Sequence, residues 1–227
     1  MVQIEESNEM KFFLYLKALA EIRKEQGKIR LSSSQIGKIW GVSQQTASRI
    51  IIGMERDGLI RRKINGKTQD IEIEERGMDI LYDIFGELSD LLEVERDLEI
   101  AGKVKSGLGE GRYYVSKKPY VTQFTEKLGI VPYPGTLNVK IEPEYESVLR
   151  QLRGRKGILI EGFSSDDRTY GAVKAFKCMI DGTDCALIFP YRSIYRDVME
   201  IISSEFLREK LNLKDEDEVR IKFTLKR

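Results

Sequence analysis

Three glycines lie within five positions of the stretch GLGEGRYYVS, at Gly107, Gly109 and Gly111, and Arg112 follows them. Glycine lets the main chain approach a ligand closely, and successive backbone N–H groups can surround an anion. The stretch lacks the Lys-Ser or Lys-Thr ending of a P-loop, and the RYYV segment after it favours a strand rather than a helix. We therefore predict a loop between two strands, which either holds an anion or is a glycine-rich hairpin turn.

A second pair of polar side chains follows in LGIVPYPGTLNVKIE, where one residue separates Thr136 from Asn138. Alternate residues of a strand point to one face, so these two side chains lie together, and Leu137 and Val139 face the other way. Two neutral oxygen ligands can hold Mg²⁺ that is already bound by phosphates. The alternative interpretation is a half-buried strand with a polar face.

The chain has 227 residues, a formal net charge of +1, 41% hydrophobic residues and no histidine. This composition supports a soluble protein with a real core, in which any contact with nucleic acid must come from a local patch. The absence of histidine excludes Ser-His and Cys-His nucleophile pairs and imidazole metal sites. The acidic start MVQIEESNEM is not a secretory signal and no apolar run could span a bilayer, so we expect a cytoplasmic protein without membrane contact.

The two cysteines, Cys178 and Cys185, flank Asp181-Gly182 in FKCMIDGTDCALIF, a pattern that predicts a hairpin. With a four-residue turn, Cys178 would lie opposite Leu187 and only diagonal to Cys185. We expect buried free thiols rather than a disulfide.

The pattern of the sequence changes near residue 97. Before this point it is helical, and afterwards it consists mainly of strands and turns, with all five prolines and both cysteines after residue 118. We predict two domains, residues 1–97 and residues 98–227. About six strands and one short helix in the second domain indicate a small β-barrel, so the fold class is multidomain α+β.

The first domain has the elements of a winged helix-turn-helix. A short helix is expected to turn Ile36, Ile39 and Trp40 inward, and Ser43 is a good N-cap for the next helix, QQTASRIIIGMERDG. Asn65-Gly66 then predicts the turn of a β-hairpin. This order of elements resembles a winged helix-turn-helix domain over about residues 8–75.

That resemblance implies contact with double-stranded DNA, because the second helix of such a domain enters the major groove. Amide side chains can read adenine there, and cations from the helix and the wing can neutralise phosphates. The alternative is a winged helix that makes only protein contacts. The residues expected at the DNA are Gln44, Gln45, Ser48, Arg49, Arg62 and Lys63, with Arg61 and Lys67 as further wing cations.

The segment GMDILYDIFGELSDLLEVE predicts another helix with a long apolar stripe. The stripe either caps the first domain or forms a homodimer seam, and we favour the dimer because DNA readers often pair to read two half-sites. It consists of Leu81, Ile84, Phe85, Leu88, Leu91 and Leu92.

Several stretches of the second domain together resemble the archaeal CTP-dependent riboflavin kinases. They are SGLGEGRYYVS, LGIVPYPGTLNVKI, YGAVKAFKC, IFPYRSIY, DVMEIIS and LREKLNLKDEDEVRI, and they cover about residues 98–226. The resemblance implies a compact six-stranded β-barrel that transfers the γ-phosphoryl group of CTP to the 5′-hydroxyl of riboflavin, giving FMN and CDP. Some members carry an N-terminal winged helix and regulate riboflavin genes, which matches the two-part layout of this chain.

The resemblance also implies roles for individual residues. Thr136 and Asn138 would hold Mg²⁺, while Ser193, which stands where the family often has Thr, and Glu200 would contact the flavin. No general base is evident; Glu200 is a candidate, although a hydrogen-bonding role is favoured for it. The residues implied at the nucleotide are Gly107, Leu108, Gly109, Glu110, Gly111 and Arg112 around the phosphates, and Glu205, Phe206, Leu207 and Arg208 on the cytidine side.

Two other functions fit the same motifs. The chain could be a pure transcription regulator whose barrel senses flavin or CTP without catalysis. It could also be a kinase whose winged helix is only structural. The formation of FMN separates the first alternative from the kinase, and binding to DNA separates the second.

Overall fold

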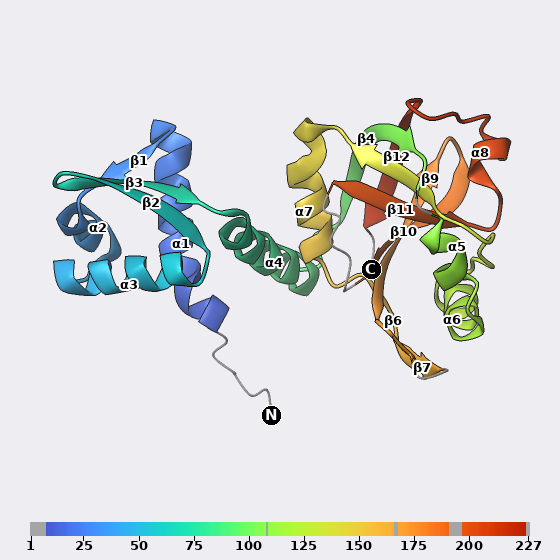
Figure 1. The fold of residues 1–227 in the computed structure, drawn as a ribbon, viewed down its shortest axis with the longest axis horizontal. Coiled ribbons are helices and arrows are strands. Elements are labelled where there is room, and N and C mark those ends of the chain that lie inside the picture. Colours follow the sequence, from blue (N-terminus) through green and yellow to red (C-terminus); the bar gives the residue numbers. More distant parts are fainter. Residues whose placement is uncertain (1–7, 108, 166–167, 191–196, 226–227) are drawn as a thin grey trace. The chain divides into compact units, whose positions relative to one another are not determined.

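The computed structural model describes residues 8–107, 109–165, 168–190 and 197–225, without the side chains of residues 8, 9 and 110. The chain forms two compact units, residues 1–85 and 86–227 (Figure 1). The domain boundary that we predicted after residue 97, from the change in sequence pattern there, stays a prediction. No helix in the described ranges is long and apolar enough to cross a membrane.

The first unit is a winged helix-turn-helix, as predicted. Three antiparallel strands form its sheet, in the order β1-β3-β2. Its elements are α1 (Asn8–Gln26), β1 (Ile29–Leu31), α2 (Ser33–Trp40), α3 (Gln44–Arg56), β2 (Ile60–Asn65), β3 (Thr68–Ile73) and the first turns of α4 (Glu75–Leu91).

Helix α3 begins where the sequence predicts, because the Ser43 hydroxyl accepts a hydrogen bond from the Thr46 N–H at 3.1 Å. The helix buries Ala47, Ile51 and Met54 against α1 and the sheet. One expectation for α2 is wrong. Its buried residues are Ile36 and Gly37, which places Ile39 on the outer side of the helix, where it is 48% exposed.

The wing hairpin turns one residue later than predicted. Asn65 pairs with Thr68, so the turn consists of Gly66 and Lys67 rather than Asn65 and Gly66. Gly66 has a φ of 61°. A glycine with positive φ at the first central position is the pattern of a type II′ turn, whereas the predicted Asn-Gly turn would be type I′.

The second unit is a closed six-stranded antiparallel β-barrel, again as predicted. Its strands follow one another in the order β10-β11-β5-β4-β12-β9, and β9 pairs with β10 to close the ring. A short strand, β6 (Ile158–Ile160), pairs with β9 outside the ring, and β7 (Phe163–Ser165) and β8 (Arg168–Tyr170) form a separate hairpin. The barrel strands are β4 (Arg96–Lys105), β5 (Leu137–Ile141), β9 (Val173–Ile180), β10 (Thr183–Pro190), β11 (Val198–Ser203) and β12 (Glu218–Leu225).

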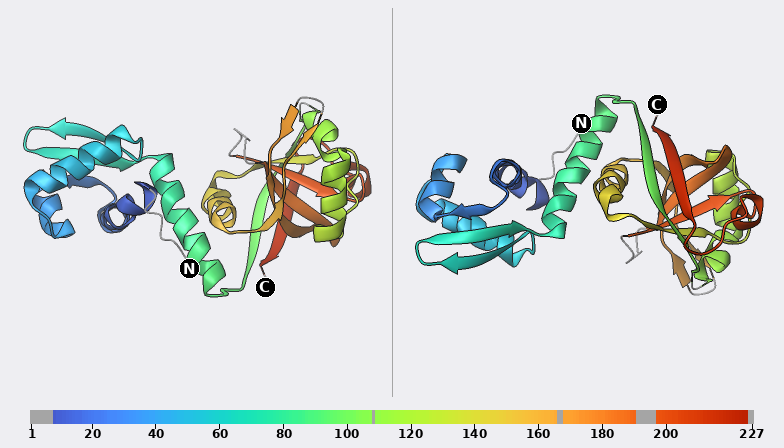
Figure 2. Two further views of the ribbon diagram at one scale, coloured as in Figure 1. Left: turned by 90° about the horizontal axis from the view of Figure 1, so that it is seen from below. Right: turned by 90° about the horizontal axis from the view of Figure 1, so that it is seen from above.

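Two hydrophobic clusters lie on the two faces of the barrel wall. The inner cluster joins alternate strand residues, such as Val104, Val139 and Leu187, to α7 (Glu146–Gly154) and to α8 (Leu207–Lys210). The outer cluster packs α5 (Glu110–Val115) and α6 (Lys118–Leu128) against β9, β10 and β11. Figures 1 and 2 show α7 and the α5–α6 pair on opposite sides of the barrel.

Two predictions about this unit are wrong. The segment after the glycine loop is the helix α5 rather than a strand, and α6 follows it, so more than one short helix accompanies the barrel. The hairpin around the cysteines has a two-residue turn, with Asp181 and Gly182 at φ values of 45° and 78°, so Cys178 lies directly opposite Cys185. Both thiols are buried and free, as expected.

Candidate functional site

A cleft of about 290 Å³ lies where the glycine loop meets β5 and β11. Its strand residues alternate with those of the inner cluster, so the cleft opens on the outer face of the barrel. The residues that line it are Lys105, Ser106, Gly107, Gly109, Gly111, Arg112, Gly135, Thr136, Asn138, Val198 and Glu200.

Each of the three positions in the loop requires glycine for a different structural reason. A Cβ atom on Gly107 would lie 1.9 Å from Nδ2 of Asn138, and a Cβ atom on Gly111 would lie 2.4 Å from Oγ1 of Thr136. Gly109 has a φ of 82°, a left-handed conformation that other residues adopt only with strain. The loop is therefore fitted around the Thr136–Asn138 pair, and it leads into α5.

Charged side chains flank this pair in one row across the sheet. Asn138 is the cross-strand partner of Lys105 on β4 and of Glu200 on β11. Directly paired residues of neighbouring strands share a face, so the side chains of Lys105, Asn138 and Glu200 leave the sheet on the same side. Lys105 also forms an ion pair with Glu216, which lowers the pKa of the Glu216 carboxyl.

The Thr136–Asn138 pair fits a bound Mg²⁺. The Thr136 hydroxyl donates a hydrogen bond to Oδ1 of Asn138 at 3.2 Å. Neighbouring ligands of an octahedral Mg²⁺ are about 2.9 Å apart, so both oxygens can bind one ion after the hydroxyl hydrogen turns away. In the described part of the chain there is no cluster of three or more His, Cys, Asp or Glu side chains that could hold a metal. The further ligands of a Mg²⁺ ion on this pair would be phosphate oxygens and water.

A second, smaller groove adjoins the cleft and shares Gly135 and Thr136 with it. The rings of Tyr133 and Phe206 stack beside it, with centroids 5.0 Å apart and planes inclined by 22°. The segment from Glu205 to Arg208 lines the groove, so the structure brings this predicted nucleotide segment next to the predicted metal ligands.

Asp215 connects this groove to the glycine loop. Its carboxylate accepts hydrogen bonds from the Ser106 hydroxyl at 2.8 Å and from the Arg208 guanidinium at 2.7 Å. Ser106 and Arg208 together hold the pKa of the Asp215 carboxyl below its usual value of 3.8. Sequence reasoning missed Asp215, because the contact joins residues 109 positions apart.

A third groove continues the cleft on its other side and shares Gly109 and Arg112 with it. Its other lining residues are Tyr113, Ser116 and Lys117 of the α5–α6 segment. Sequence reasoning also missed these residues, because it assigned RYYV to a strand.

Most of the predicted site residues therefore meet in one place. Gly107, Gly109, Gly111, Arg112 and Glu200 line the same cleft as the predicted metal ligands, and Glu205 to Arg208 line the adjoining groove. Leu108 and Ser193 lie outside the described residues, and of Glu110 only the backbone, at the start of α5, is described. Lys105 and Ser106, just before the glycines, are additional cleft residues that the motif did not include.

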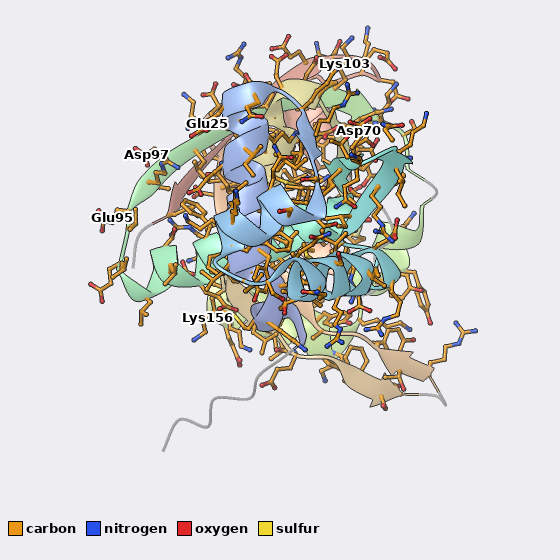
Figure 3. All side chains as sticks on the ribbon, turned by 90° about the vertical axis from the view of Figure 1, so that its left-hand side faces the viewer. Glu25, Asp70, Glu95, Asp97, Lys103 and Lys156 are labelled. Carbon is orange, nitrogen blue, oxygen red and sulfur yellow. The ribbon has the colours of Figure 1, made fainter. Side chains whose placement is uncertain are left out.

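The predicted DNA face is an exposed side of α3. Gln44, Gln45 and Arg49 are exposed and Ser48 is partly exposed. Among the described residues, Arg49 has no ion-pair partner. The adjacent wing is mixed in charge, since Asp70 on β3 (Figure 3) accepts a hydrogen bond from Arg30 at 2.6 Å.

Arg62 has a different environment from the other predicted DNA contacts. Its guanidinium donates to Glu55 of α3 at 2.7 Å, and its side chain is only 20% exposed. This ion pair joins α3 to the wing. Arg61 is likewise paired with Glu72 and Glu74, so Lys63 and Lys67 are the wing cations for which no ion pair is found within the described ranges.

Both units match known protein families. Residues 104–223 match the family model CTP-dep_RFKase, which carries the description "Domain of unknown function DUF120". Residues 14–68 match the model of the MarR family. These matches assign the barrel and the winged helix to two families that a single chain combines here.

Curated relatives match this chain over nearly their whole length. A riboflavin kinase of Thermoplasma volcanium is 48% identical over 94% of this chain and 97% of its own. Riboflavin kinases of Thermoplasma acidophilum and Archaeoglobus fulgidus are 46% and 44% identical, over 96% and 91% of their lengths. This chain belongs to the archaeal riboflavin kinase family, and the resemblance found in its sequence is confirmed.

Proposed function

We propose that this chain is a cytoplasmic kinase that transfers the γ-phosphoryl group of CTP to the 5′-hydroxyl of riboflavin, giving FMN and CDP. The observation that carries this proposal is the packing of Gly107 and Gly111 against Asn138 and Thr136. Family membership supports riboflavin as the acceptor. The name of the matching family model supports CTP as the donor.

Phosphoryl transfer depends mainly on positioning and on neutralising charge. Backbone N–H groups of the glycine loop, with Lys105 and Arg112, line one cleft and can hold the phosphate oxygens there. Thr136 and Asn138 are the residues that would hold Mg²⁺, which when bound offsets negative charge on the phosphates. Glu200 lies across from Asn138, where it can accept a hydrogen bond from the acceptor hydroxyl.

The direct test is incubation of the purified full chain with riboflavin, Mg²⁺ and CTP, followed by separation of FMN from riboflavin. Parallel reactions with ATP, GTP and UTP measure nucleotide choice. FMN formation that is fastest with CTP supports the proposal. If no nucleotide gives FMN but CTP or riboflavin binds, the chain is a sensor rather than a kinase.

We also propose that the first unit binds double-stranded DNA and regulates riboflavin genes. The exposed amides and the Arg49 cation on α3, together with the MarR-family match, favour this second function. A gel-shift titration against DNA from upstream of its own gene, repeated over a salt series, tests it. If the chain binds upstream DNA no more tightly than unrelated DNA at every salt concentration, the winged helix has only a structural role.

The end of α4 supports our proposal of a homodimer. The predicted stripe divides in two: Leu81 and Ile84 pack against the core of the first unit, whereas Leu88, Leu91 and Leu92 are 48%, 77% and 70% exposed. Contiguous exposed leucines mark an interaction surface. Light scattering after size exclusion should give a dimer for the native chain and a monomer for Leu91→Glu/Leu92→Glu.

A further inference from the structure

Ile52 of α3 is an exposed apolar side chain to which neither the family matches nor the sequence motifs assign a role. It is 51% exposed and is outside the described hydrophobic core of the first unit. The described isoleucines that are exposed are Ile39, Ile52 and Ile64. They lie on α2, α3 and β2, which belong to the helix-turn-helix and the wing.

The helical repeat places Ile52 on the predicted DNA face. Residues three, four and seven positions apart share one face of a helix. The residues of α3 that have this spacing and are at least partly exposed are Gln45, Ser48, Arg49 and Ile52. The buried residues of α3 lie on the opposite side and are Ala47, Ile51 and Met54. Ile52 therefore extends the face that carries the Gln45 amide and the Arg49 cation, and it points away from the core.

Neither packing nor helix stability explains an isoleucine at this position. A side chain that stays half exposed gains little from burial. Isoleucine is β-branched and is a weaker helix former than leucine, lysine or glutamate. The second half of α3 is instead held to the wing by the hydrogen bond from Arg62 to Glu55 at 2.7 Å. These observations favour a role of Ile52 in binding.

The chemistry of the major groove selects the group that Ile52 can contact. Phosphates and the hydrogen-bonding edges of the bases suit the amides and the cation of this face, whereas an aliphatic side chain suits the C5-methyl group of thymine. Ile52 lies about 10 Å along the helix axis from Gln45, at a rise of about 1.5 Å per residue. Because base pairs are stacked about 3.4 Å apart, the two side chains can contact different base pairs.

We propose that Ile52 contacts the C5-methyl group of a thymine in the major groove and makes the chain select a T·A pair at that position of its DNA site. This inference rests on the proposed binding of DNA by the first unit. It adds a base-specific apolar contact to the amide and phosphate contacts expected there. Since the contact depends on the methyl group, it distinguishes thymine from uracil, which pairs with adenine in the same way.

Replacing thymine by uracil tests this contact before the site itself is mapped, because uracil lacks only the C5-methyl group. The upstream DNA fragment is amplified either with dTTP or with dUTP and uracil-containing primers, and each form is titrated with the full chain in a gel shift. The native chain should bind the thymine form more tightly, by about fourfold for each methyl group that Ile52 contacts. Ile52→Ser should reduce the ratio of the two affinities by the same factor. Serine has about the helix propensity of isoleucine, so α3 should be preserved.

Leu14→Ser is the matched control, because it removes an aliphatic side chain that is 69% exposed on α1, and it should keep the native ratio. The inference is overturned if the native chain prefers its upstream DNA to unrelated DNA but Ile52→Ser, shown by its circular dichroism to be folded, keeps the native ratio of affinities for the thymine and uracil forms. A native chain without any preference for upstream DNA contradicts the proposed DNA binding itself, and the readout by Ile52 fails with it.

Discussion

Gly107 and Asn138 are packed so closely that a Cβ atom on the glycine would lie 1.9 Å from Nδ2 of the amide. The contact joins the segment after β4 to β5, and both residues line the cleft. The main chain of the loop and the amide side chain therefore form one unit, and a change in either one must move the other.

This contact predicts a non-additive pair of substitutions. Gly107→Ala should displace the Asn138 amide, destabilise the barrel by about 1–3 kcal/mol and lower kcat severely. Asn138→Ala should also lower kcat severely while the fold survives, since it removes the amide oxygen that is a candidate Mg²⁺ ligand. In the double variant the clash is absent, so urea unfolding should show less destabilisation than Gly107→Ala alone, with activity still lost. Full activity with a normal Mg²⁺ dependence in Asn138→Ala would remove that residue from the metal site.

Asp215 is expected to affect nucleotide binding more than turnover. Asp215→Asn weakens the hold on Arg208 and Ser106, so we expect the KM for CTP to rise about tenfold, with kcat and the KM for riboflavin little changed. A merely structural role would change all three values together. Arg220→Gln, which alters an exposed ion pair with Glu99 on the barrel, is the control.

The same carboxylate gives a pH dependence. Its pKa is lowered in the folded chain, so its contribution to stability is present above the unfolded value of about 3.8 and is lost as the pH falls through the lower folded value. The difference in stability between the native chain and Asp215→Asn should therefore be constant near neutral pH and shrink below about pH 3.8. A difference that grows on acidification would contradict this assignment.

Glu216, next to Asp215, has a φ of 72° and so carries backbone strain. Glu216→Gly and Glu216→Ala both remove the ion pair with Lys105, but only glycine adopts this conformation without strain. The glycine variant should be more stable than the alanine variant by about 1 kcal/mol in urea unfolding. Equal stabilities would show that the turn relaxes.

The sequence predicted this fold well where a local pattern decides the structure. Ser43 as an N-cap and the alternation of side chains from Thr136 to Val139 depend on neighbours a few residues away. The segment RYYV shows the limit. Its residues favour a strand, but Val115 is buried among α6 and barrel residues, and this packing outweighs the local preference.

The candidate site was likewise predictable only where residues close together in the sequence form it. Thr136 and Asn138 could be paired from strand alternation, and the glycines are adjacent in sequence. Asp215 reaches the site only through barrel closure, by contacts with Ser106 and Arg208, so no spacing along the chain reveals it. The pairing of Cys178 with Cys185 follows from a two-residue turn. The Asp181-Gly182 dipeptide favours that turn, so the sequence contained the signal that our four-residue turn overlooked.

Arg49 is expected to act only in DNA binding. Arg49→Ala should weaken binding to upstream DNA and reduce the slope of log affinity against log salt by about 1, as expected for one lost phosphate contact. Kinase activity should not change, since the residue is in the other unit. Lys24→Ala, an exposed cation at the end of α1, is the control for net charge. Loss of kinase activity with unchanged DNA affinity would contradict the division of functions.

Asp90 tests where the second domain begins. Gly86 packs against Gly154 of α7, and Asp90 accepts hydrogen bonds from the Arg155 guanidinium at 3.2 Å and from the Lys156 N–H at 2.6 Å. Because the Arg155 side chain is only 9% exposed, Asp90→Ala leaves a buried cation without this partner. It should destabilise the second unit by about 3 kcal/mol, whereas Glu87→Ala on the same helix should have little effect. By the same reasoning, a fragment of residues 98–227 should unfold at a lower temperature than a fragment of residues 86–227. Equal melting temperatures would support the boundary after residue 97 and show that the end of α4 adds nothing to the barrel.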